Sequence, residues 1–170
     1  MSALTDFRNT KDDFFKNDPQ SPLDRVQRSA FSGLNYFPEN PHLRFNVVLE
    51  KAEKPEHIIM TTSTGDEQEY IHVGQFRFSV NGEKAILQVY VSETDGSFFI
   101  PFVDATAPAE TYGAGRYLEP EDLGDGQLRV DFNLAYNPYC AYNDNWSCPL
   151  PPRGNRISVR IEAGEKNFHE

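Results

Sequence analysis

The sequence of 170 residues contains only two cysteines, two methionines and one tryptophan. It lacks any run of about 20 apolar residues, which is the length that a membrane-spanning helix needs. The opening segment, residues 1–15, has no basic start followed by an apolar stretch, as a secretory signal would have. These absences lead us to expect a cytoplasmic protein without a membrane partner.

Basic residues are also scarce, since 16 Lys and Arg stand against 26 Asp and Glu, for a net charge of -10. Phosphate backbones and anionic lipids are held mainly by clustered Lys and Arg, so we expect no nucleic acid partner. Aromatic residues are abundant, with 13 Phe and 8 Tyr. This composition favours one globular domain with an aromatic core over a disordered chain.

The first 35 residues carry the spacing of amphipathic helices. A weak apolar stripe at Leu4, Phe7 and Phe14 predicts a short helix that ends before Pro19. A second helix is predicted over 22–33, with Ser21 as its N-cap. We therefore divide the chain into an N-terminal helical extension, 1–20, and a single β-rich domain, 21–170.

Beyond Pro41 the apolar residues alternate with polar ones, as in half-buried strands. Asn81-Gly82 and Asp95-Gly96 are typical of tight hairpin turns, so the strands between 69 and 102 should form a meander. The sequence predicts a mainly β fold, a single antiparallel β-barrel or β-sandwich with one or two N-terminal helices. The predicted strands are 43–49, 57–62, 69–80, 83–91, 98–103, 127–133 and 157–163.

Two irregular stretches, 104–118 and 133–155, are dense in polar and aromatic side chains. Long structured loops in a small domain often carry function, so we place the candidate site there, together with the strand end at 131. The candidate ligand-binding residues are Asp104, Glu110, Tyr112, Arg116, Asp131, Asn133, Tyr136 and Asn137.

The same stretches contain the strings PFVDATAPAETYGAGRYL, DFNLAYNPYCAYNDNWSCPLPPRGN and IEAGEK. With SPL and F-x-GL-x-YF near the start, the chain resembles, over roughly 21–167, a bacterial and archaeal family known only as a domain of unknown function. The resemblance implies no activity. Many relatives carry an export or lipoprotein signal, which this sequence does not show.

Three functions remain open for these residues. The first is a small-ligand-binding domain with a polar site rimmed by aromatic residues, built from 104–118 and 131–155. The second is an acid/base enzyme of the hydrolase or lyase type, with Asp104, Glu110 or Asp131 as acid or base and Arg116 as electrostatic partner. The third is a purely structural domain whose polar residues fix its loops. A single site requires Asp104, Arg116, Asp131 and Asn133 to meet in space.

Cys140 and Cys148 form a possible disulfide that would close a short loop. Two free structural thiols and a metal-binding or catalytic thiol are the alternatives.

The four histidines show no spacing typical of metal ligands, so the sequence predicts neither a metal nor another cofactor. We interpret His72, on an apolar strand, as a hydrogen-bonded core residue rather than a base. The sequence does not indicate an oligomeric state.

Overall fold

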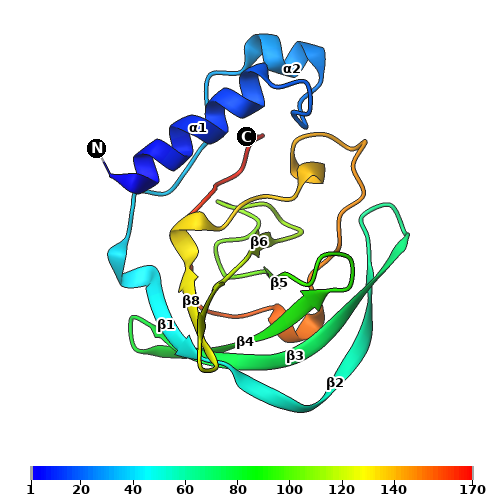
Figure 1. Ribbon diagram of the computed structural model, residues 1–170. Helices are drawn as coiled ribbons and strands as arrows, with labels where there is room; N and C mark the ends of the chain where they lie inside the picture. Colours follow the sequence, from blue (N-terminus) through cyan, green and yellow to red (C-terminus); the bar gives the residue numbers. More distant parts are fainter. Residues whose placement is uncertain (1, 170) are drawn as a thin grey trace.

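Two antiparallel sheets form the body of the protein in the computed structural model, which describes residues 2–169 (Figure 1). The smaller sheet has the strand order β1-β8-β7 and the larger one has the order β2-β3-β4-β5-β6. The two sheets do not close into a barrel, so the predicted mainly β fold is confirmed as a sandwich. The strands are β1 (Arg44–Val48), β2 (Glu50–Thr61), β3 (Glu67–Val80), β4 (Glu83–Ser92), β5 (Phe98–Phe102), β6 (Arg116–Leu118), β7 (Glu121–Gly124) and β8 (Gln127–Asp131).

The predicted meander is confirmed, because β3, β4 and β5 are consecutive antiparallel neighbours. Asn81 and Gly82 turn the β3–β4 hairpin with φ of 51° and 83°, the left-handed pair that a two-residue turn of this kind requires. β2 is longer than predicted, since it begins at Glu50. Its first half is almost wholly exposed and has a bulge, so apolar alternation could not mark it.

The predicted strand at 157–163 is wrong. Val159, Ile161 and Ala163 are buried in alternation, as in a strand. Their backbone hydrogen bonds run to loop 104–118 instead of to a neighbouring strand: Ala105 N donates to the Val159 carbonyl (2.9 Å) and Ile161 N to the Asp104 carboxylate (2.6 Å). The short strands β6 and β7 were not predicted, because three or four residues carry too little alternation.

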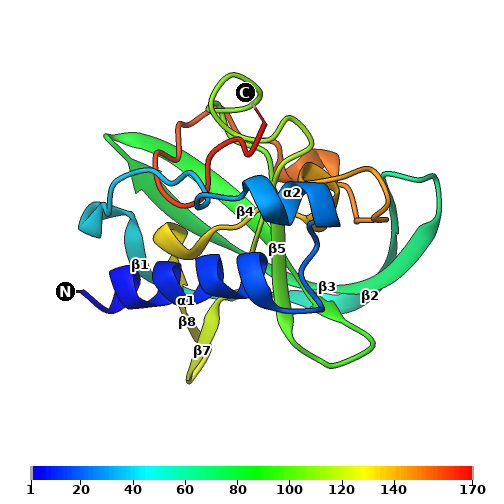
Figure 2. The ribbon, with the colours of Figure 1, turned by 90° about the horizontal axis from the view of Figure 1, so that it is seen from above.

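Helix α1 (Ala3–Asn17) is longer than its apolar stripe predicted, and α2 (Arg25–Ala30) is shorter. Asp24, rather than Ser21, caps α2 through a capping box with Gln27. The Ser21 hydroxyl instead donates to the Phe15 carbonyl (2.7 Å) and joins the turn to α1. Figure 2 shows both helices over one end of the sheets.

The core has three parts. Facing strands of both sheets bury a large cluster in which the Phe132 ring packs edge-on to Phe45 and Phe102. A second cluster lies between Tyr90, Phe99 and Tyr117 and includes both cysteines. The third cluster holds the helices and contains Phe15, Leu23, Leu34 and Tyr142. Because Phe15 packs edge-on to Tyr142, 5.0 Å between centroids, α1 is fixed on the irregular second stretch.

Four 3₁₀ turns connect the irregular segments: η1 (Pro41–Leu43), η2 (Phe132–Leu134), η3 (Tyr139–Ala141) and η4 (Arg153–Asn155). Asn155 in η4 is fully buried and donates to the carbonyls of Gln88 (3.0 Å) and Pro101 (2.8 Å). This amide therefore ties the chain after the second stretch to β4 and β5. Among the described helices, none combines the length and apolarity needed to span a membrane.

Candidate functional site

Arg116 in β6 and Asn137 are the most buried of the predicted site residues, each with 1% of its surface exposed. The Arg116 side chain has the larger number of internal partners. Its guanidinium donates hydrogen bonds to the main-chain carbonyls of Ile161 (3.0 Å), Ala163 and Glu165 (3.1 Å). It also forms an ion pair with Asp104, 3.4 Å from Nη2 to Oδ1. Burial lowers the pKa of Arg116, and the neighbouring Asp104 carboxylate opposes this effect. Arg116 therefore holds the C-terminal segment against β6.

Asp104 is also buried, at 4% exposed, and lies two residues after the end of β5. Its carboxylate accepts hydrogen bonds from the Ile161 backbone (2.6 Å) and from the Thr106 hydroxyl (2.9 Å), besides the Arg116 contact. The Asp104 carboxylate thus has a counter-charge and hydrogen-bond donors inside the protein. The pair contributes order to the first stretch and to segment 161–165.

Asp131 and Asn133 form a separate pair at the end of β8. The Asp131 carboxylate caps η2 by accepting from Asn133 N (3.0 Å) and binds Arg44 Nε (3.0 Å). The Asn133 amide exchanges hydrogen bonds with the backbone of Asn40, at 2.8 Å and 2.9 Å. Within residues 2–169, no hydrogen bond or ion pair joins this pair to Asp104 and Arg116.

The other four predicted residues do not gather at one point. Each has its own partner: the Glu110 carboxylate pairs with Arg160, the Tyr112 hydroxyl donates to Cys140 Sγ (3.5 Å), the Tyr136 hydroxyl donates to Glu119 (2.5 Å), and the Asn137 amide donates to the Lys166 carbonyl (3.0 Å). Burial is the main cause of a raised pKa for both tyrosines. These residues mainly connect the two stretches to neighbouring segments.

The thiols of Cys140 and Cys148 are free, buried and adjacent. Cys140 N donates to Cys148 Sγ at 3.3 Å. A hydrogen bond from the Cys148 thiol lowers the pKa of Cys140 to about 6, and the same contact raises the pKa of Cys148. The predicted disulfide remains a prediction. His72 is half-buried and its Nε2 lies 2.7 Å from the Gln88 side chain, as expected for a hydrogen-bonded core histidine.

Sequence reasoning missed Glu165, which is 1% exposed and lies next to the site residues. Its carboxylate accepts a hydrogen bond from the Tyr142 hydroxyl and forms an ion pair with Lys11 of α1. Burial, followed by the Glu165 charge, raises the pKa of Tyr142 far above its ordinary value. The IEAGEK string was the only signal for Glu165, since its partners are distant in sequence.

A polar groove lies beside this buried network. It has a volume of about 780 Å³. The groove runs between segment 34–36, the loop at 109–110 and the C-terminal segment 166–169. Its lining residues are Leu34, Asn35, Tyr36, Ala109, Glu110, Lys166, Asn167 and His169. Glu110 is thus the one predicted site residue that lines it.

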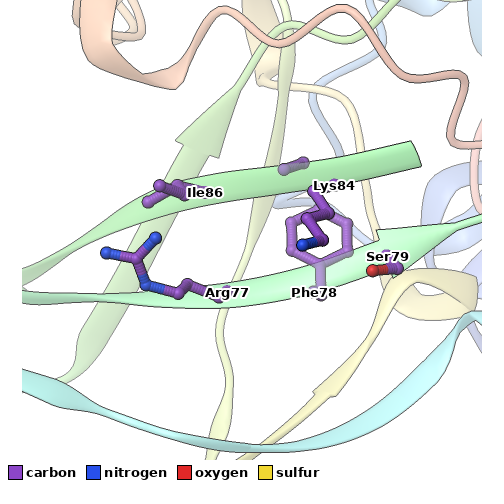
Figure 3. A pocket seen from close by; sticks show the side chains of 6 residues that line it. Arg77, Phe78, Ser79, Lys84 and Ile86 are labelled. Atoms are coloured by element: carbon purple, nitrogen blue, oxygen red, sulfur yellow. The ribbon is translucent and has the colours of Figure 1, made fainter. Parts of the chain in front are cut away.

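Figure 3 shows another hollow, of about 580 Å³, on the β3–β4 hairpin. Arg77 and Lys84 give it a basic character, and all of its lining residues come from these two adjacent strands. Within residues 2–169, no third element contributes to its lining. The groove at the C-terminal segment, which residues of three separate segments line, is therefore the better candidate for a ligand site.

Comparisons with known proteins agree with the fold. No curated protein matches the chain significantly. The solution NMR structure of an uncharacterized protein from Haloarcula marismortui is similar, with 38% identity and a TM-score of 0.72 over 96% of this chain and 91% of the other. A family described as "Protein of unknown function (DUF1684)" matches residues 29–166. The chain therefore belongs to this family of unknown function, as the sequence resemblance implied.

Proposed function

We propose that the protein binds a small polar ligand carrying an anionic group, in the groove between segments 34–36, 109–110 and 166–169. The observation that supports this proposal is a groove of about 780 Å³ with side chains of both charge signs along it. That volume is within the roughly 300–1,000 Å³ of small-molecule sites.

The groups in the groove complement such a ligand. The Lys166 ammonium suits a carboxylate or phosphate oxygen, and the His169 imidazole, whose Nε2 donates to the Tyr142 carbonyl (2.9 Å), borders the groove. The side-chain amides of Asn35 and Asn167 already donate to main-chain carbonyls, so their oxygens are left to accept from ligand hydroxyl or amino groups. The Glu110 carboxylate pairs with Arg160 and has capacity to accept a further hydrogen bond. Tyr36 provides the aromatic surface that fixes a polar ligand from one side.

The groove is rigid at its base, which reduces the entropic cost of binding. Lys166 N donates to the Asn35 carbonyl (2.8 Å), and Asn167 N donates to the Glu110 carbonyl (3.0 Å). The Asn35 amide returns a hydrogen bond to the Asn167 carbonyl (3.0 Å). These bonds join the three segments at the positions that carry the polar side chains.

The geometry gives less support to an acid/base enzyme at the sequence motifs. A catalytic acid or base has to reach a substrate. Asp104 and Arg116 are 4% and 1% exposed and are already occupied by internal partners. Their contacts favour the structural interpretation for the motif residues, with ligand binding at the adjacent groove.

The test is a ligand screen by ¹⁵N NMR against small carboxylates, phosphates, sugar acids and amino acids. Binding should shift the resonances of 34–36, 109–110 and 166–169. Lys166→Met should weaken a compound found in this way by roughly tenfold or more, because a charge-assisted hydrogen bond is worth about 1.5–3 kcal/mol. The control, Lys84→Met at an exposed position of β4, should bind the compound with unchanged affinity. Equal affinity of the Lys166 variant, or a complete screen without shifts at the groove, would contradict the proposal.

A further inference from the structure

We propose that His57, Glu69 and Glu93 form a binding site for a divalent first-row transition metal ion, with Zn²⁺ as the representative. The site is on the outer face of the larger sheet and is independent of the groove. One ligand atom from each residue can be chosen so that all three lie within 4.8 Å of one another. His57 Nδ1 is 2.8 Å from a Glu93 carboxylate oxygen.

Strand pairing brings the three residues together. His57 belongs to β2 and Glu69 to β3, while Glu93 directly follows β4. Tyr70 pairs with Ser92, so Glu69 and Glu93 are the next two residues facing each other across β3 and β4. Ile59 pairs with Glu69, which puts His57 diagonally across from Glu69 on the neighbouring strand.

All three side chains project to solvent on the same face. Ile58, Met60 and Tyr70 belong to the buried cluster around the cysteines. Because successive side chains of a strand alternate, His57 and Glu69 point away from that cluster, and both are exposed. The paired strands β2 and β3 therefore hold two of the ligands, and the turn after β4 holds the third, on a face that is open to an incoming ion.

The charges at this position favour a cation. Two carboxylates facing each other on adjacent strands repel. Among residues 2–169, Glu69 takes part in no ion pair with Lys, Arg or His, and Glu93 pairs only with His57. A divalent ion between the three side chains would replace this repulsion by attraction.

The donor set indicates the class of metal. One imidazole nitrogen and two carboxylate oxygens form a mixed set that suits Zn²⁺ and related first-row ions, whereas Mg²⁺ and Ca²⁺ prefer oxygen alone. Three protein ligands leave a coordination position for water. The spacing of histidines along the sequence could not predict this site, since its ligands come from β2, from β3 and from the turn after β4.

Zn²⁺ is titrated into the full chain without an affinity tag, and binding is measured by isothermal titration calorimetry at fixed neutral pH. We expect saturable binding of one ion. His57→Gln and Glu69→Gln should each weaken it by at least about tenfold. His42→Gln and Glu83→Gln are matched controls, because they remove an exposed histidine and an exposed glutamate away from the site, and should leave affinity unchanged.

A second measurement distinguishes this site from the cysteine pair, which also offers zinc ligands. Substoichiometric Ni²⁺ should broaden amide NMR signals near 57, 69 and 93 by its paramagnetism, and signals near 140 and 148 should remain sharp. The proposal is overturned if no saturable Zn²⁺ binding occurs, if His57→Gln and Glu69→Gln bind like the unsubstituted protein, or if broadening centres on the cysteines. All variants are substitutions of exposed side chains, so their folding can be checked by the dispersion of the same spectra.

Discussion

Arg116→Met tests whether the buried ion pair of the family motif holds the fold together. The substitution keeps much of the side-chain volume but removes the charge and every donor. It leaves the carbonyls of Ile161, Ala163 and Glu165 without their hydrogen bonds, and it leaves the Asp104 carboxylate buried beside an apolar group. We expect a large loss of stability and no new interaction to compensate for it.

The magnitude follows from the burial of both partners, which are 1% and 4% exposed. Removing one partner of a buried ion pair costs about 3–5 kcal/mol. Asp104 keeps donors at Ile161 N and Thr106, which places the expected loss near the middle of that range, at about 4 kcal/mol. For a chain of this size, that loss lowers Tm by about 8–16 °C.

The assay is urea unfolding followed by circular dichroism, with the m value recorded for each variant. Arg129→Met is the matched control, because the Arg129–Glu121 pair is 51% and 63% exposed and should contribute less than about 1 kcal/mol. Adding Asp104→Asn to Arg116→Met should recover part of the loss, since it removes the uncompensated charge. A loss under about 1 kcal/mol with an unchanged m value would refute the reasoning.

Three further predictions concern the backbone and the thiols. Gly164→Ala should lower the free energy of unfolding by about 2–4 kcal/mol more than Gly126→Ala does. Both glycines have a left-handed φ, +80° and +76°, but a Cβ at Gly164 would lie 2.6 Å from the Ala135 carbonyl oxygen, whereas one at Gly126 meets no atom within 4 Å. Equal losses in urea unfolding would show that the close approach is unimportant. Oxidation should join Cys140 to Cys148 and raise the free energy of unfolding by about 2.5 kcal/mol, for a loop of roughly eight residues. The bond is tested by mass spectrometry after alkylation, and the stability by urea unfolding with and without reductant. Two alkylated thiols in the oxidised protein would contradict the prediction. In the reduced protein, alkylation of Cys140 should increase as the pH rises through about 6, because the thiolate forms there.

Local pattern was sufficient for the elements whose signal lies within a few neighbouring residues. The β3–β4 hairpin could be predicted because Asn81-Gly82 separates two alternating segments. Residues 157–163 alternate equally well, yet they pair with a loop and with the Asp104 carboxylate. Alternation reports which side chains are buried, and it does not identify the partner of the backbone.

For the candidate site too, the sequence predicted some features, and others depended on the tertiary structure. The sequence named Asp104 and Arg116 as candidates, and the fold joins these two residues in an ion pair beside β5 and β6. It could not separate them from Asp131 and Asn133, because all four occur at strand ends in similar polar strings. Glu165 had no recognisable local role, since Lys11 and Tyr142, its partners, are remote in sequence.

The sequence by itself determined the class of the chain: an acidic, aromatic-rich domain, mainly β, with N-terminal helices and membership of a family of unknown function. Composition, periodicity and turn residues suffice for this, because they act over a few residues at a time. Only the tertiary structure decided that the motif carboxylate and guanidinium are buried, and that polar side chains line a groove at the C-terminal segment. It also decided that His57, Glu69 and Glu93 share one face of the sheet. Burial and the meeting of distant side chains depend on how strands pair and segments pack, which no local pattern contains.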